Sequence, residues 1–105
     1  MIGGMPLDEK PPVLKRVVPS GTRAGQGFNV QPNGQAALCV DCENALPSTA
    51  IVWCETSLPT AFGNSHALSA LVPAALYARP ARVKLYLKDR LTGLQSNVEQ
   101  FTVSR

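Results

Sequence analysis

Residues 51–73, I-V-W-C-E-T-S-L-P-T-A-F-G-N-S-H-A-L-S-A-L-V-P, decide the predicted fold. Core-type residues recur two positions apart in three short runs separated by turn formers: Ile51 and Trp53; Leu58, Thr60 and Phe62; Leu68, Ala70 and Val72. Because successive side chains of a strand point to opposite faces, such runs are typical of half-buried strands in a sandwich. The first run holds the only tryptophan, so we expect it at the centre of a small β core.

The composition favours one globular domain. The chain has 105 residues, 45% hydrophobic and 16% charged, which excludes disorder for most of it and suffices for one core without metals or several disulfides. Nine prolines and eight glycines, spread along the chain, argue against long helices. We expect a flexible leader or linker over residues 1–12, which show no periodicity, and a single domain over residues 13–105.

The rest of the chain adds further predicted strands. The pattern predicts core strands after Pro12, over residues 35–44, over residues 82–88, and around Phe101 and Val103. It also predicts a short edge strand at Phe28 and Val30 and one helical turn over residues 74–78. About seven short strands with regularly spaced turns predict an all-β fold, an immunoglobulin-like two-sheet antiparallel sandwich. Its two sheets should enclose Trp53 against three residues: Val40, Leu85 and Phe101.

These motifs together resemble the IPT/TIG family of immunoglobulin-like domains, which belongs to the early set of that fold. The resemblance covers residues 14–103 and rests on L-C-V-D-C-E-N-A, I-V-W-C-E-T-S-L-P-T-A-F, L-S-A-L-V-P-A-A-L, V-K-L-Y-L and S-N-V-E-Q-F-T-V. Two departures concern local turns: Cys42 stands where the family often has glycine, and Cys54-Glu55 replaces a small turn. The resemblance implies a structural or binding module of a larger protein and no catalytic residue, since a fold alone implies no function.

No catalytic or metal-binding constellation stands out. Three cysteines leave at least one unpaired. Cys39 and Cys42 are three apart on a strand and point to opposite faces, so we expect structural thiols, no metal and no redox role. Cys39 can approach Cys54 only if their strands are neighbours. The one histidine, His66, is expected in an exposed loop, and Asp41 and Glu43 on a solvated strand face. We therefore expect neither enzymatic activity nor a cofactor.

One stretch of the chain is unusually rich in positive charge. Five cations and a single acid fall within residues 79–90, and alternation puts part of this set on one strand face with a tyrosine. An exposed aromatic among cations can bind acidic protein, anionic glycan or nucleic acid, although a solvated sheet face is the more common case. The candidate binding face consists of Arg79, Arg82, Lys84, Tyr86, Lys88 and Arg90.

Together with the resemblance, which implies a module of a larger bacterial protein or assembly, the sequence predicts a protein-interaction or spacer module. The alternative is a carbohydrate-binding accessory domain of a secreted or surface enzyme, for which Tyr86 and Tyr77 are few exposed aromatics. A nucleic-acid partner is not expected at a net charge of +3. No apolar run approaches the roughly 18 residues of a membrane span, and no signal peptide is visible; location at the cell surface or outside would require a longer exported protein.

Overall fold

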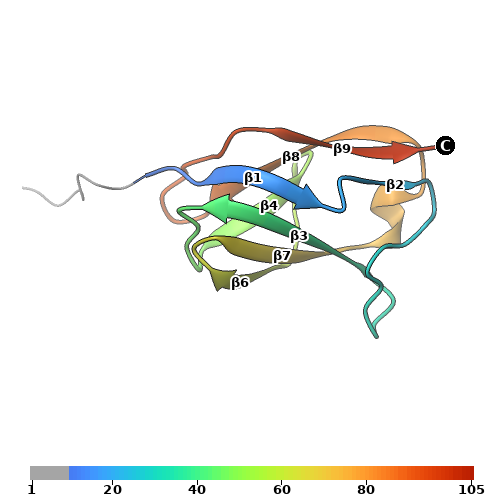
Figure 1. The fold of residues 1–105 in the computed structure, drawn as a ribbon, viewed down its shortest axis with the longest axis horizontal. Coiled ribbons are helices and arrows are strands. Elements are labelled where there is room, and N and C mark those ends of the chain that lie inside the picture. Colours follow the sequence, from blue (N-terminus) through green and yellow to red (C-terminus); the bar gives the residue numbers. More distant parts are fainter. Residues whose placement is uncertain (1–9) are drawn as a thin grey trace, which may run out of the picture.

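Two β-sheets packed face to face build the protein, as the alternating runs predict (Figure 1). The structure is a computed structural model that describes residues 10–105. The all-β sandwich is therefore confirmed for this part of the chain. The leader predicted over residues 1–12 falls largely outside it, apart from the last three residues, of which Pro12 is buried.

The first sheet has four antiparallel strands in the order β1-β3-β7-β6. They comprise β1 (Val13–Val18), β3 (Ala36–Glu43), β6 (Thr60–Asn64) and β7 (Ala67–Val72). Burial alternates along β3 and β7, because one face of this sheet covers the core and the other meets solvent. The strands predicted after Pro12, over residues 35–44 and around Leu68 are thereby confirmed.

The second sheet has five strands in the order β2-β9-β8-β4-β5. They comprise β2 (Gly21–Arg23), β4 (Thr49–Trp53), β5 (Thr56–Ser57), β8 (Ala81–Asp89) and β9 (Glu99–Ser104). Between β7 and β8 lies one turn of 3₁₀ helix, η1 (Ala74–Tyr77), where the helical turn is predicted. β2 runs parallel to β9, so the sandwich is not antiparallel throughout.

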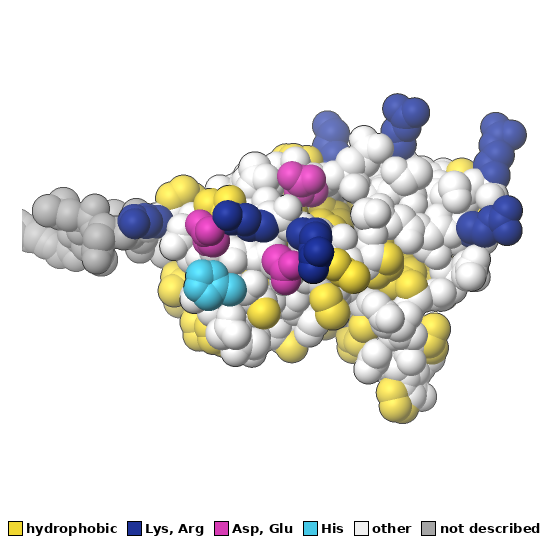
Figure 2. Space-filling model, viewed as in Figure 1, with side chains coloured by type: hydrophobic (Ala, Val, Ile, Leu, Met, Phe, Trp, Pro, Cys, Tyr) yellow, Lys and Arg dark blue, Asp and Glu magenta, His cyan; other side chains and the backbone are white. Residues whose placement is uncertain are grey.

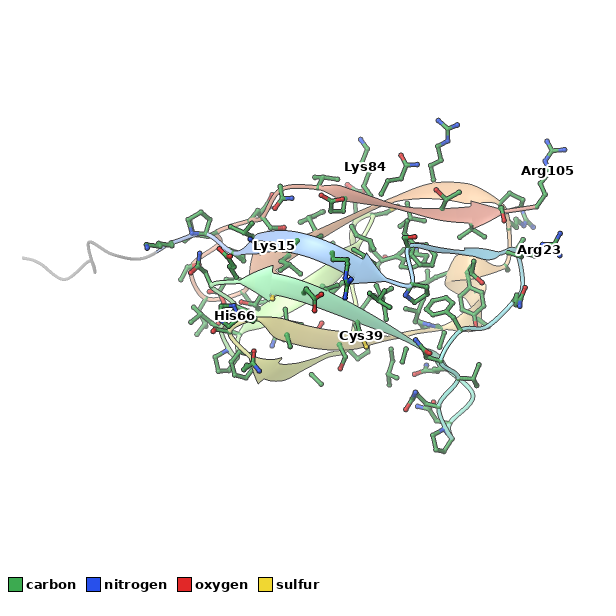
Figure 3. The ribbon with its side chains drawn as sticks, in the orientation of Figure 1. Lys15, Arg23, Cys39, His66, Lys84 and Arg105 are labelled. Atoms are coloured by element: carbon green, nitrogen blue, oxygen red, sulfur yellow. The ribbon has the colours of Figure 1, made fainter. Side chains whose placement is uncertain are left out.

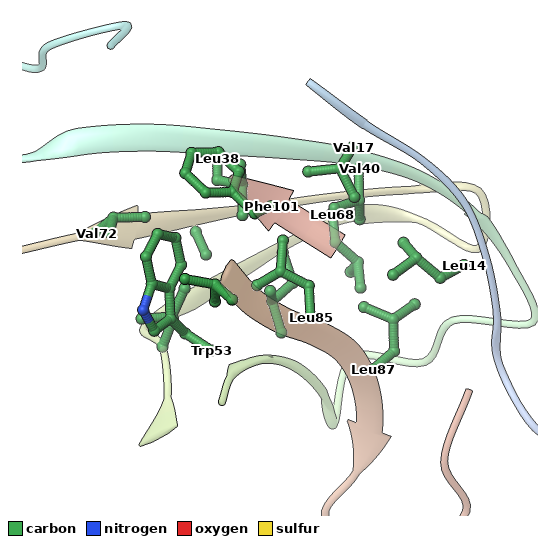
Figure 4. Close-up of a cluster of buried hydrophobic side chains, with 14 of the residues drawn as sticks. Leu14, Val17, Leu38, Val40, Trp53, Leu68, Val72, Leu85, Leu87 and Phe101 are labelled. Atoms are coloured by element: carbon green, nitrogen blue, oxygen red, sulfur yellow. The ribbon is translucent and has the colours of Figure 1, made fainter. Parts of the chain in front are cut away.

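The core lies between the sheets and includes the predicted tryptophan. Trp53 is 3% exposed, lies directly opposite Leu85 on β8, and packs against Phe101 with the rings tilted and their centroids 5.0 Å apart. Val40 belongs to the same cluster of buried residues. Figure 4 shows Trp53 at one end of the cluster and Leu14 and Leu87 at the other. The tryptophan thus joins side chains of both sheets.

Two predicted strands are wrong in detail. Phe28 and Val30 form no strand; Phe28 instead packs between Tyr77 and Phe101, with ring centroids 5.4 and 5.5 Å away, and the edge strand is β2, seven residues earlier. The predicted run from Leu58 to Phe62 is also divided, because the chain crosses there from the second sheet to the first. Nine strands result where about seven are predicted, the two shortest being β2 and β5.

One core strand is buried on both faces, unlike its predicted half-buried state. All five residues of β4 are buried. Ala50 and Val52 point outward, but they lie opposite Lys88 and Tyr86, whose longer side chains cover the smaller ones. At β4, the outer surface of the second sheet is therefore formed largely by the side chains of β8.

Candidate functional site

The predicted binding face lies on the outer side of β8. Along this strand Val83, Leu85 and Leu87 are buried, whereas Arg82, Lys84 and Lys88 are exposed and Tyr86 is partly exposed. This alternation follows from the pleat, since the apolar positions face the core and the next positions face solvent. We call the set of Arg82, Lys84, Tyr86 and Lys88 the β8 face.

The strands beside β8 place no acid directly opposite these cations, and Glu99 of β9 lies opposite Leu85, which faces the core. Arg82 lies opposite Thr102 and Lys84 opposite Gln100 on β9, while Lys88 lies opposite Ala50 on β4. The ion pairs found among residues 10–105 both lie on the other sheet, and Asp89 points into the protein. Like charges on one strand with no acid directly opposite produce a positive local field although the net charge is small.

The flanking arginines extend this face along a line. Arg79 is exposed in the segment between η1 and β8, and Arg90 is exposed directly after β8, where its Nε donates to the Ser48 carbonyl at 3.3 Å. A strand of nine residues is about 27 Å long, so the two arginines lie near opposite ends. The four residues of the β8 face thus lie along one strand, with Arg79 before it and Arg90 after it, and none of these four lines either the groove at the β6 side of the sandwich or the hollow between β2 and β9.

Two further cations join the same edge of the protein, and the sequence analysis missed both. The parallel pairing of β2 with β9 puts Arg23 opposite Ser104, the residue before Arg105. In Figure 3, Lys84 and Arg105 project from the upper rim and Arg23 lies beside it. No local sequence pattern predicts this arrangement, because residues 19–21 have the composition of a turn and β2 begins at the last of them.

The aromatic surface is smaller than the sequence suggests. Tyr77 is 3% exposed and packs against Phe28, and Trp53 is in the core. Tyr86 is therefore the one ring of the second sheet's outer surface, and it is only partly exposed. Phe62, 41% exposed, lies on the edge strand of the other sheet. Stacking platforms for sugar rings are consequently sparse on the β8 face.

The cysteines lie apart. On β3, Cys39 is exposed and Cys42 is buried, so they occupy opposite faces as predicted, while Cys54 is exposed after β4 in the other sheet and is not a strand neighbour of Cys39. Burial, and to a lesser extent the Asp41 charge, raises the pKa of the Cys42 thiol. Within the part of the chain that the structure describes, no three His, Cys, Asp or Glu side chains are grouped to hold a metal ion.

The outer face of the first sheet carries charges of both signs (Figure 2). Lys15 pairs with Glu43 at 2.8 Å and Arg16 with Asp41 at 3.1 Å, all on exposed or partly exposed side chains. The hydrogen bond from Lys15, together with its charge, lowers the pKa of Glu43. His66 is exposed, as expected, with its Nδ1 3.2 Å from the Cys42 carbonyl oxygen. Each acid thus has a cationic partner, which suits a solvated face.

A groove of about 940 Å³ lies at the β6 side of the sandwich. Small or apolar side chains dominate its wall, including Cys39, Ala61, Ser69 and Leu71. Cys39 and Arg90 are the ionisable residues among those that line it.

Comparisons with known proteins leave the family open. No protein-family model matches the sequence, and a search of curated proteins finds no match. The IPT/TIG resemblance therefore stays a prediction. In the described residues the structure has no helix with the length and hydrophobicity needed to cross a bilayer.

Proposed function

We propose that this chain is a non-catalytic immunoglobulin-like module, of the IPT/TIG type, that binds a protein partner or spaces its neighbours in a larger bacterial protein or assembly. The strand order supports the fold assignment. In immunoglobulin domains one sheet has the order A-B-E-D and the other contains C, F and G. The orders β1-β3-β7-β6 and β9-β8-β4 correspond to A-B-E-D and G-F-C when the strands are lettered along the chain with the two shortest, β2 and β5, left out.

The observation that carries the binding proposal is the β8 face. None of its cations has an acid directly opposite it on a neighbouring strand, and they alternate along one strand. Side chains on one face of a strand are roughly 7 Å apart, which is also the spacing of alternate side chains in an extended peptide. An acidic, extended protein segment can thus place its carboxylates in step with Arg82 and Lys84.

A carbohydrate-binding accessory domain remains the weaker alternative. Sugar sites use exposed aromatic rings with polar groups around them, and here Tyr77 is buried and Tyr86 half-buried. No observation on the face favours a neutral sugar over an acidic peptide.

Charge reversal tests the proposal. We expect Lys84→Glu and Lys88→Glu to weaken binding of labelled poly-L-glutamate on the order of tenfold at low salt, measured by fluorescence anisotropy. Added salt should weaken the wild-type interaction, because exposed charges are screened. Thermal stability should hardly change, since exposed charges contribute little to folding.

The control is Lys10→Glu, which changes the net charge equally at an exposed position outside the β8 face. Equal loss in all three variants would show that only net charge matters. No loss at Lys84 or Lys88 would leave the β8 face as solvated surface and the module as a passive spacer.

A further inference from the structure

A polar hollow lies beyond the β8 face, where β2 meets β9. Its volume is about 580 Å³, and Gly21 and the backbone of both strands contribute to its wall. Its side chains are hydroxyl, amide and guanidinium groups, with no acid among them: Ser20, Thr22, Arg23, Gln26, Thr102 and Ser104.

The internal hydrogen bonds leave several of these donors free. Thr22 Oγ1 donates to the Gln26 carbonyl at 2.8 Å and Ser104 Oγ to the Thr22 carbonyl at 3.3 Å, so both hydroxyl protons are used. Thr102 Oγ1 accepts from Gln100 Nε2 at 3.3 Å, which leaves its own proton available. Within residues 10–105 the side chains of Ser20, Arg23 and Gln26 donate to no protein atom at hydrogen-bond distance.

One arginine, Arg23, lines this hollow, and a second, Arg82, lies on the far side of β9 next to Thr102. Arg82 lies opposite Thr102 across β8 and β9, and Arg23 lies opposite Ser104 across β2 and β9. Strand spacing and rise put their Cα atoms roughly 12 Å apart, within joint reach of a ligand over β9. All three strands present these side chains on one surface, since paired residues share a face.

We propose that the hollow between β2 and β9 binds a tetrahedral oxyanion, a sulfate or phosphate group. Arg23 and Arg82 supply charge from two sides, and the Thr102 and Ser20 hydroxyls and the Gln26 amide supply further donors. A tetrahedral group accepts from several directions, whereas a carboxylate presents two oxygens in one plane, so the arrangement of donors around the hollow suits the former.

The test uses inorganic sulfate and phosphate, with chloride at equal ionic strength, in titrations followed by amide chemical shifts of the labelled protein. We expect saturable shifts at residues 20–26 and 102–104 and at Arg82 with either oxyanion, and none with chloride. Arg23→Gln should weaken binding on the order of tenfold, and Thr102→Val severalfold, because each removes a donor to a charged group.

Arg79→Gln is the matched control, since it removes an exposed arginine outside the hollow. Both Arg23 and Thr102 are exposed, and valine suits a strand, so neither substitution should unfold the protein; the shifts of the remaining amides verify this. Shifts that rise linearly without saturation, or an equal loss in Arg79→Gln and Arg23→Gln, would overturn the site.

The site shares Arg82 with the β8 face but does not need Lys84 or Lys88, and two measurements separate the two proposals. Lys84→Glu should weaken poly-L-glutamate binding and leave the sulfate-induced shifts near Arg23 in place. Sulfate shifts that disappear in Lys84→Glu would mean that the anion sits on the β8 face, contrary to this inference. If poly-L-glutamate still binds but no saturable sulfate shifts are seen, the oxyanion site is rejected and the proposed function is unaffected.

Discussion

At the scale of single residues, Trp53 should matter most for stability. It is 3% exposed, lies opposite Leu85, and packs against Phe101, so its removal leaves a void between the sheets. We expect Trp53→Ala to lower the free energy of unfolding by about 3–5 kcal/mol, as for other large buried aromatics. Urea denaturation followed by far-UV circular dichroism measures this change.

The control for Trp53 is an apolar side chain in solvent. Leu91 is 85% exposed, so Leu91→Ala should change the free energy of unfolding by less than about 0.5 kcal/mol. Wild-type fluorescence should be blue-shifted because the indole is out of water. Red-shifted emission from the folded protein, or a small loss in Trp53→Ala, would contradict the register of β4 against β8.

At the scale of elements, the connection from β8 to β9 is held down by buried polar contacts. Asp89 is 1% exposed and accepts hydrogen bonds from the Ser48 hydroxyl and, at 2.8 Å, from the Thr92 amide. Further along, Asn97 bonds to both the amide and the carbonyl of Leu14, at 2.8 and 2.9 Å, as a neighbouring strand would. These two side chains tie the connection to the turn before β4 and to β1.

Protonation of Asp89 should loosen this connection. Burial acts to raise the pKa of the carboxyl, but the hydrogen bonds from Ser48 and Thr92 outweigh it and hold the pKa below the ordinary value. The carboxylate therefore stabilises the fold above the unfolded-state pKa, about 3.9, and this contribution is lost as the pH falls through the folded-state pKa. Asp89→Asn should lower the free energy of unfolding by about 1–3 kcal/mol at pH 7.

The difference between wild type and Asp89→Asn should shrink at pH 3, because this pH lies below the unfolded-state pKa of about 3.9 and the unfolded chain then binds a proton at this carboxyl. Urea denaturation at pH 7, 5 and 3 measures it. A difference that stays constant over this range would show that the charge of Asp89 contributes nothing beyond its shape and hydrogen bonds.

Elements with a clear period were predictable, and those defined by distant partners were not. β3, β7 and β8 alternate cleanly, so their faces follow from the pleat alone. β2 has three residues and exists because β9, near the other end of the chain, pairs with it. Phe28 has strand propensity, but packing against Tyr77 and Phe101 decides its position.

The same distinction applies to the candidate sites. The β8 face is local in sequence, and the positions of Arg82, Lys84 and Lys88 were therefore predicted correctly as outward. The hollow combines β2 with β9, and Arg23 enters it only through their pairing. A lone arginine in a glycine-rich stretch carries no signal of such a neighbour.

At the scale of the whole molecule, the sandwich should unfold as one unit. The buried cluster includes residues from both sheets, and Trp53 and Phe101 meet within it, so neither sheet can keep its inner face covered alone. The chain also alternates between the sheets. β1, β3, β6 and β7 belong to the first sheet, whereas β2, β4, β5, β8 and β9 belong to the second. We expect the midpoints of Trp53 fluorescence and far-UV circular dichroism in urea to coincide.

The same topology predicts slow folding. Neighbouring strands such as β2 and β9 are separated by most of the sequence, and closing such long loops costs chain entropy before the contacts form. We expect a main folding phase of milliseconds to seconds in stopped-flow refolding, as for other sandwiches. Leu91→Ala should leave this rate unchanged. Folding in microseconds would contradict this expectation. A fluorescence midpoint well separated from that of circular dichroism would mean that one sheet is stable without the other.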